Sequence, residues 1–253
     1  MRGREKALDL ALARAVVSRF LKMGFRPPRL ETLQNLSAPA AVTALRRATL
    51  LIGGPELTAE ADLFGRWGIP SLEQMEGDYN RLFGHTLRGS VCPYETEYGN
   101  AHAFQQAQML SDMAGFYRAF GLHPADGVSE RVDHIAFELE FLEFLSRKEA
   151  FALERDDRDM LEVTGLAVKK LLGEHLGRFG RAVGWRLRQE NRNGFYGRLG
   201  SLCAVFLRIE CERQTVPVGP EVLELRSSEE ERVPMACGTV HDGQETGATT
   251  FEV

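Results

Sequence analysis

The chain has 253 residues, of which 43% are hydrophobic and 26% are charged, an ordinary composition for a globular protein. A formal net charge of -5 and a pI near 5.8 give no electrostatic reason to expect nucleic-acid binding. No apolar run approaches the roughly 20 residues that cross a bilayer, and the basic, amphipathic N-terminus lacks the features of a secretory signal. We therefore expect a cytoplasmic protein without stable membrane insertion.

The hydrophobic pattern is helical along most of the chain, and no alternating run predicts a strand. Proline and glycine separate the helices, and Ser71 with Gln74 forms a capping-box pattern. In the first half of the chain, helices are predicted over residues 4–23, about 38–52, from near Thr58 to before Gly68, and from Ser71 to about Phe83. Further helices are predicted over residues 103–121 and 130–150, and a last one over about 196–213. Between these, a helix is predicted from Asp156 to Leu172, and it continues after a break to Glu190. We predict an all-α fold, with one bundle-like domain of about eight to nine helices over residues 1–215.

Two later segments differ from the rest in composition. Residues 216–253 are rich in Pro, Gly, Ser, Thr and Glu and have few large apolar residues. Such a segment buries too little surface to offset the entropy of ordering it, so we predict an acidic, flexible or loosely docked tail. Residues 178–198 are rich in arginine, and we interpret them as a solvated basic face.

The stretch ERVDHIAFELEFLEFLSRKEA (130–150) places polar residues on both sides of one predicted helix. Glu140, Glu143 and Arg147 share the side that we expect to be solvated. His134 and Glu138, one turn apart, project towards the apolar side, where burial of a charge is costly. Either the pair satisfies itself or nearby backbone groups in the core, or it belongs to a binding site at the edge of a cleft.

The motifs of common catalytic sites are absent. The sequence contains no P-loop, no HExxH zinc motif and no GxSxG nucleophile elbow. Cys237 and His241 have a CxxxH spacing, but two ligands in a tail make a weak metal site. The four cysteines form no CxxC pair, and we expect reduced thiols. We predict no catalytic residues, no cofactor and no metal.

Several motifs follow one another in a fixed order over residues 70–210. They are Tyr79-Asn-Arg-Leu-Phe83, CPYETEYG at 92–99, QQAQMLSDMAGFYRAFGL at 105–122, ERVDHIAFELEFLEFLSRKEA at 130–150 and EHLGRF at 174–179. The most specific is an acid, two residues and Asp-His at the start of a helix rich in Glu and Leu. In this order and spacing the motifs resemble the TorD/DmsD/NarJ family of molybdoenzyme maturation chaperones, also called redox enzyme maturation proteins.

The resemblance implies an all-helical cytoplasmic chaperone that is not an enzyme and holds no cofactor of its own. Members of this family bind the immature, apo catalytic subunit of a molybdopterin-containing oxidoreductase, often through its twin-arginine leader. They hold that subunit back from export until the molybdenum cofactor is inserted. A monomer and a domain-swapped dimer are both compatible with the sequence.

The resemblance also points to candidate client-binding residues. The Asp-His pair of the family maps onto Asp133 and His134, and its preceding acid maps onto Glu130. The full set that we predict is Tyr79, Phe83, Tyr94, Phe116, Tyr117, Glu130, Asp133, His134 and Glu138. We hypothesise that Asp133, His134 and Glu138 form the polar lip of an apolar groove, with aromatic side chains as its wall.

Two other classes of function stay open from the sequence. One is a metal-dependent helical enzyme that uses His134 and Glu138 as ligands, with a third ligand from His102, His123 or His175. The other is a structural subunit of a redox complex. Stoichiometric metal would favour the first, and permanent association with a mature, cofactor-loaded enzyme would favour the second.

Overall fold

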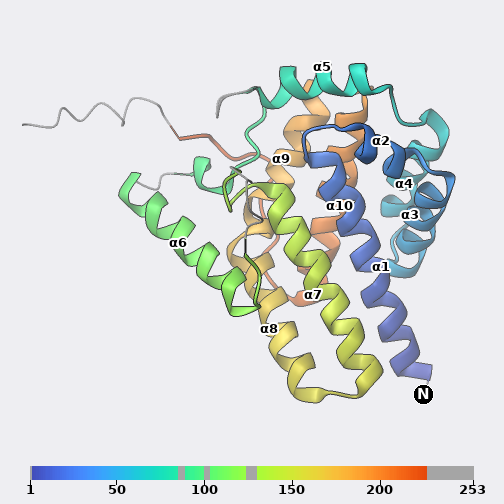
Figure 1. The fold of residues 1–253 in the computed structure, drawn as a ribbon, viewed down its shortest axis with the longest axis vertical. Coiled ribbons are helices and arrows are strands. Elements are labelled where there is room, and N and C mark those ends of the chain that lie inside the picture. The colour runs from blue at the N-terminus through green and yellow to red at the C-terminus, as the bar shows by residue number, and fades with distance from the viewer. Residues whose placement is uncertain (1, 85–88, 100–102, 124–129, 227–253) are drawn as a thin grey trace, which may run out of the picture.

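The computed structural model describes residues 2–84, 89–99, 103–123 and 130–226. These residues form a bundle of α-helices and contain no β-strand (Figure 1). The helices are α1 (Arg2–Phe25), α2 (Leu30–Ser37), α3 (Pro39–Ile52), α4 (Pro55–Trp67), α5 (Leu72–Phe83), α6 (Ala103–Ala119), α7 (Ile135–Arg155), α8 (Arg158–Glu174), α9 (Leu176–Glu190) and α10 (Phe195–Gln214). A short 3-10 helix, η1, spans Glu95–Glu97. The all-α prediction is confirmed, with slightly more helices than expected.

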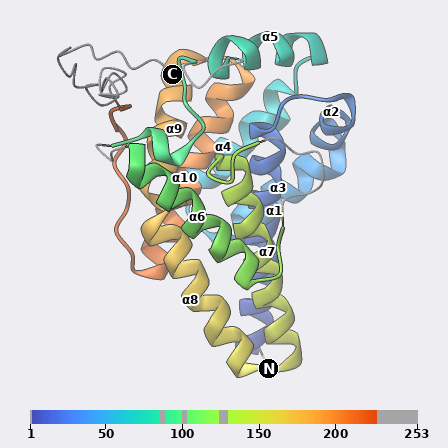
Figure 2. The same ribbon diagram turned by 60° about the vertical axis from the view of Figure 1, so that its left-hand side comes forward.

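Two long helix pairs form the body of the bundle. α1 packs along α7, and α9 packs along α10, while α8 joins the two pairs (Figures 1 and 2). α2, α3 and α4 cover one side, and α5 lies across one end of the bundle (Figure 1). Within the described residues, no helix is both long and apolar enough to cross a membrane.

The core lies where these helices meet. Its largest fully buried apolar side chains include Phe25, Phe64, Phe141, Phe179, Phe195 and Phe206. α9 and α10 approach each other most closely at Gly184 and Gly200, where a Cβ on either glycine would lie 2.4 Å from the carbonyl oxygen of the other. Any larger residue at these two positions would separate the helices, so glycine is required there.

The helix boundaries follow local rules with two exceptions. The capping box is confirmed, because Gln74 N donates to Ser71 Oγ and Ser71 N donates to Gln74 Oε1, both at 3.3 Å. The break predicted between Leu172 and Glu190 is present and falls at His175. The N-cap expected at Thr58 is wrong, because α4 begins at Pro55, a residue pre-organised for the first helical position. α2 was not predicted, because it is short and has no side-chain cap.

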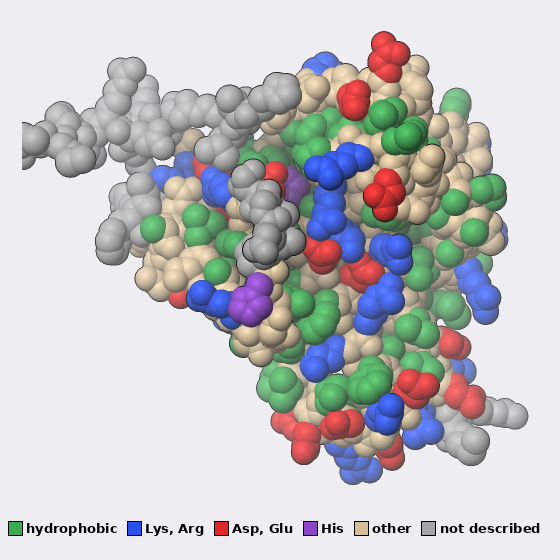
Figure 3. All heavy atoms as spheres, viewed as in Figure 1, with side chains coloured by type: hydrophobic (Ala, Val, Ile, Leu, Met, Phe, Trp, Pro, Cys, Tyr) green, Lys and Arg blue, Asp and Glu red, His purple; other side chains and the backbone are tan. Residues whose placement is uncertain are grey.

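The charged side of α7 is a helix interface rather than a solvated face. Glu143 is 7% exposed and accepts a hydrogen bond from Lys22 Nζ of α1 at 2.6 Å. Glu140 pairs with Lys22 at 3.3 Å and with Arg26 at 2.6 Å. Figure 3 shows basic and acidic side chains close together over this face. The prediction of a solvated side is wrong for Glu143, because α1 packs along α7.

The first part of the predicted tail is docked on the bundle. Arg226 N donates to Glu97 O at 2.9 Å, and Gly99 N donates to Glu224 O at 3.1 Å. Arg181 donates to Gly219 O at 2.6 Å, so backbone groups provide the contacts that the composition did not reveal. The remainder of the tail, 227–253, with Cys237 and His241, lies outside the described residues.

Candidate functional site

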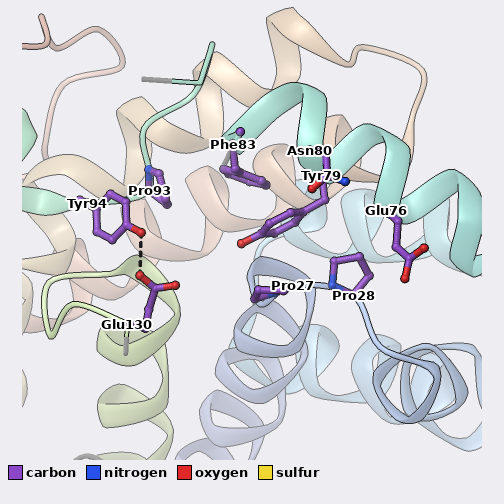
Figure 4. A pocket seen from close by; sticks show the side chains of 10 residues that line it. Pro27, Pro28, Glu76, Tyr79, Asn80, Phe83, Pro93, Tyr94 and Glu130 are labelled. Carbon is purple, nitrogen blue, oxygen red and sulfur yellow. Dashed lines mark hydrogen bonds between the residues drawn. The ribbon is translucent and has the colours of Figure 1, made fainter. Parts of the chain in front are cut away.

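A cavity of about 520 Å³ lies beside α5 (Figure 4). We call it the aromatic cavity. It is lined by Pro27, Pro28, Glu76, Tyr79, Asn80, Phe83, Gly84, Pro93, Tyr94 and Glu130. Four of the predicted residues, Tyr79, Phe83, Tyr94 and Glu130, therefore meet in one place although up to 51 positions separate them in the chain.

Helical spacing presents one face of α5 to the aromatic cavity. Glu76, Tyr79, Asn80 and Phe83 are three, four and seven residues apart, which places them on one side of a helix. The opposite wall comes from Pro27 and Pro28, which follow the end of α1. A proline wall needs no hydrogen-bond partner for its ring nitrogen, so it can border an open cavity without an unsatisfied donor.

The aromatic wall is anchored in the core. The rings of Tyr79 and Phe83 are 4.7 Å apart, and both contact the ring of Tyr196, which is fully buried. Burial raises the pKa of Tyr79 and of Tyr94, so both phenols are neutral donors at pH 7. The cavity thus presents apolar rings held in fixed positions.

Two carboxylates stand on opposite sides of Tyr79 (Figure 4). Glu130 accepts a hydrogen bond from Tyr94 Oη at 2.6 Å and one from Arg131 N at 3.3 Å. Glu76 is exposed and makes no ion pair or hydrogen bond with any described residue. A pocket with acids at its two ends and aromatic rings between them suits a segment that carries cations and apolar side chains.

Asp133 is fully buried and does not line this cavity. Its Oδ2 accepts from Thr96 N at 3.0 Å, from Thr96 Oγ1 at 2.8 Å and from Arg131 Nη2 at 2.7 Å. Arg131 also pairs with Glu97 at 2.7 Å and lies 4.6 Å from the centre of the Tyr94 ring. Asp133 therefore fixes the loop that carries Tyr94.

His134 is the N-cap of α7. Its Nδ1 accepts a hydrogen bond from Ala136 N at 3.1 Å, and its ring lies edge-on to that of Tyr94 at 5.3 Å. Burial lowers the pKa of His134 to about 4, so the ring is neutral at pH 7. His134 and Asp133 are thus buried next to Tyr94 and do not line the cavity, and their role in client binding stays a prediction.

Glu138 is fully buried, and neither of its carboxyl oxygens has a hydrogen-bond partner in the described structure. Burial raises its pKa well above the usual value, and the nearby charges of Glu95 and Asp133 raise it further against the opposing effect of Arg178. Its surroundings therefore favour the protonated form of Glu138. Of the possibilities considered for this pair, His134 is satisfied by a backbone group, Ala136 N, whereas Glu138 bonds neither to His134 nor to the backbone among the described residues.

Phe116 and Tyr117 lie on α6, away from the aromatic cavity. Their rings pack on Phe141 of α7 at 5.0 and 4.9 Å, and Tyr117 Oη donates to Val132 O at 3.2 Å. They hold α6 against α7 and line no part of the cavity. The structure thus separates the predicted site into a cavity, a buried support and an aromatic contact between two helices.

Within the described residues, the proposed metal ligands do not come together. Among the described residues no group of three or more His, Cys, Asp or Glu side chains could hold a metal ion. His175 Nδ1 lies 3.0 Å from Glu95 Oε2, and His123 is exposed. His102 lies outside the described residues.

Sequence reasoning missed Glu76, Asn80, Pro27, Pro28 and Pro93. Their positions carried a signal in part, since Glu76 and Asn80 share a helical face with Tyr79. The two adjacent prolines were interpreted only as the end of a helix, and nothing local shows that α5 packs beside them.

The fold is a helical bundle with a cavity of about 520 Å³ beside one short helix. A family model described as the nitrate reductase delta subunit matches residues 40–182. The chain belongs to this family, which comprises the NarJ/TorD-type molybdoenzyme maturation chaperones. The resemblance inferred from the sequence motifs is confirmed. No curated protein matches the chain in a direct comparison.

Proposed function

We propose that this protein is a cytoplasmic chaperone that binds the immature catalytic subunit of a molybdopterin-containing oxidoreductase through its twin-arginine leader. Binding would keep the subunit from export while the cofactor is inserted and the enzyme is assembled. The family supports the kind of client, and the aromatic cavity supports the kind of segment that is bound.

The observation that carries the proposal is the pairing of two carboxylates with an apolar wall. A twin-arginine leader presents two guanidinium groups followed by an apolar stretch. Glu76 and Glu130 supply one acceptor at each end of the cavity, and Tyr79, Phe83 and Tyr94 supply aromatic faces on which a guanidinium can stack. Tyr94 already binds Arg131 in this manner, at 4.6 Å from its ring centre.

Glu76 is the residue best placed to bind an incoming cation. It is exposed and has no partner among the described residues, so binding breaks no existing ion pair. Glu130 is already bonded to Tyr94, and an arginine that approaches it can share the second carboxylate oxygen. We expect Asp133 and His134 to act on binding indirectly, by fixing the loop that carries Tyr94.

The test is a titration of a labelled twin-arginine leader peptide, read by fluorescence anisotropy. Glu76→Gln and Glu130→Gln should each weaken binding about fivefold, the effect of losing roughly 1 kcal/mol from a partly solvated ion pair. Glu73→Gln is the matched control, because Glu73 is an exposed acid of the same helix that does not line the cavity.

A second peptide with both arginines replaced by lysine separates shape from charge. Lysine keeps the charge but loses the planar fork that stacks on aromatic rings, so we expect weaker binding to the native protein. If the Glu73→Gln and Glu76→Gln proteins lose the same affinity, or if neither loses any, the aromatic cavity is not the leader site.

A further inference from the structure

Residues 216–226 follow α10 as a segment without regular secondary structure and run outside the helices (Figure 2). We call this segment the strap. Its end reaches η1, where an isolated antiparallel bridge joins Leu225 to Tyr98. None of its residues lines the aromatic cavity, so the proposed chaperone function leaves the strap without a role.

The strap fits closely against the start of α9. A Cβ on Gly219 would lie 2.2 Å from the carbonyl oxygen of Gly177, so this approach requires glycine. Arg181 of α9 donates to Gly219 O at 2.6 Å and to Glu221 Oε1 at 2.8 Å. The arginine-rich stretch 178–198 was interpreted as a solvated face, which is wrong for Arg181, because its side chain is 15% exposed and bonds to the strap.

The far end of the strap is bound to the loop that carries Tyr94. Besides the two backbone hydrogen bonds of the strap with Glu97 and Gly99, Arg226 Nη1 donates to Gln106 Oε1 at 2.9 Å. Gln106 Nε2 in turn donates to Glu97 Oε1 at 2.9 Å. The end of the strap therefore connects α6 with η1.

Arg131 extends these contacts to the aromatic cavity. Its Nη1 donates to Glu97 Oε1 at 2.7 Å, the same oxygen that accepts from Gln106. Its guanidinium lies 4.6 Å from the centre of the Tyr94 ring, and its backbone N donates to Glu130 Oε1 at 3.3 Å. Tyr94 and Glu130 both line the cavity. A continuous series of contacts thus runs from the strap to the cavity wall.

The strap buries little of its own apolar surface. Val222 and Leu225 are 62% and 44% exposed, and Leu223 is only partly buried against the core. The buried Nε of Arg226 has no partner among the described residues. Segments with few buried apolar contacts open locally at a small cost in free energy. We therefore expect the strap to exchange between a docked and an undocked state.

We propose that the strap is a positioning element of the leader site, which holds Tyr94 and Glu130 in place when it is docked. The inference rests on the proposed function, because it concerns the same cavity. When the strap undocks, Glu97 O and Gly99 N lose their partners, and the loop gains freedom that leader binding must then restrict. A leader that binds the docked state more tightly must, by linkage, stabilise docking in return.

The test combines the leader titration with hydrogen exchange of the full chain, read by mass spectrometry. Gly219→Val should undock the strap by a clash with α9, and Leu223→Asp should undock it by placing a charge in an apolar contact. We expect each variant to bind the leader about fivefold more weakly and to exchange the amides of residues 94–99 faster. Val222→Asp is the matched control, because it places the same charge at the neighbouring, exposed position.

The leader should also slow amide exchange within residues 216–226 of the native protein, which a strap with a purely structural role would not show. Faster exchange of the strap with unchanged leader affinity, or without a change in residues 94–99, would overturn the inference. Strap exchange that neither variant alters would overturn it as well.

Both substitutions lie outside the helices, so either one tests the strap if the other variant does not fold. A native protein that binds no leader would contradict the proposed function instead. The exchange of residues 94–99 would in that case still test the connection between the strap and the loop.

Discussion

Two buried glutamates, Glu210 of α10 and Glu138 of α7, differ in whether their carboxyl groups have partners. Both side chains are 0% exposed. Glu210 accepts a hydrogen bond from Arg14 Nε at 2.6 Å and one from Arg213 at 3.3 Å, so it lies within a network of cations. Glu138 has no partner among the described residues, and its burial raises its pKa. Burial alone therefore does not say whether an acid in this protein is paired with a cation.

The two glutamates lie in different regions of the bundle. The Arg14 network lies between α1, α7 and α10 and joins helices far apart in the sequence, because Arg14 also binds Glu149 at 2.5 Å. Glu138 lies in the first turn of α7, next to the support of the aromatic cavity. The network stabilises the fold, whereas Glu138 costs stability close to the proposed site.

Removing Arg14, the cation that pairs with Glu210, should have the largest effect on the free energy of unfolding. Arg14→Met leaves Glu210 buried without its shortest ion pair, and we expect the free energy of unfolding to fall by about 3–5 kcal/mol. Urea denaturation measures the change. The double variant Arg14→Met, Glu210→Gln should recover part of the loss, and a double variant no more stable than the single one would contradict the pairing.

Removing the unpaired acid should have a smaller effect of the opposite sign. Glu138→Leu replaces a buried carboxyl without partners by an apolar side chain, and we expect a gain of about 1–3 kcal/mol in the free energy of unfolding. The same denaturation experiment measures it. A loss comparable to that of Arg14→Met would show that Glu138 has a partner that stabilises the fold.

Glu138 and His134 should make the stability of the protein depend on pH in opposite directions. The pKa of Glu138 is raised by folding, so its contribution is fully present below about pH 4.5 and is lost as the pH rises. The pKa of His134 is lowered from 6.5 to about 4, so its contribution is present above pH 6.5 and lost below it. Between these limits the two effects oppose each other, and above pH 6.5 only the decline due to Glu138 remains.

The difference in the free energy of unfolding between the native protein and Glu138→Gln isolates this decline, because the other titrating groups are common to both proteins. The free energy of unfolding of the variant should exceed that of the native protein by about 1.4 kcal/mol more for each pH unit above pH 6.5. This increase should continue up to the folded-state pKa of Glu138. Urea denaturation at several values between pH 6.5 and 8.5 provides the measurement. A constant difference over this range would mean that Glu138 is ionised in the folded protein.

The sequence was sufficient for the parts of the fold that depend on local rules. The capping box at Ser71 and the stop at Pro27-Pro28 were predicted, because each depends on residues a few positions apart. The N-terminus of α4 was misplaced because Thr58 has a suitable side chain, whereas Gly54 and Pro55 offered only backbone preferences. α2 depends mainly on packing of one fully buried side chain, Leu36.

The site was predicted only in part, for a physical reason. Helical periodicity shows which side chains share a face but not which element covers that face. Tyr79 and Phe83, predicted as client-binding residues, lie in the cavity, whereas Glu143 was not expected to be covered by α1. Pro28 and Glu130 are about 100 positions apart, and no local pattern shows that they meet.

The most direct test of the central claim is affinity purification from the native cell, with mass spectrometry and metal analysis of the same sample. The native protein and Glu73→Gln should recover one molybdoenzyme catalytic subunit that lacks its cofactor, and the double variant Glu76→Gln, Glu130→Gln should recover much less of it. Equal recovery of a mature, cofactor-loaded enzyme by all three proteins would contradict the chaperone account and favour a structural subunit. Recovery of the protein alone with stoichiometric metal would contradict it as well.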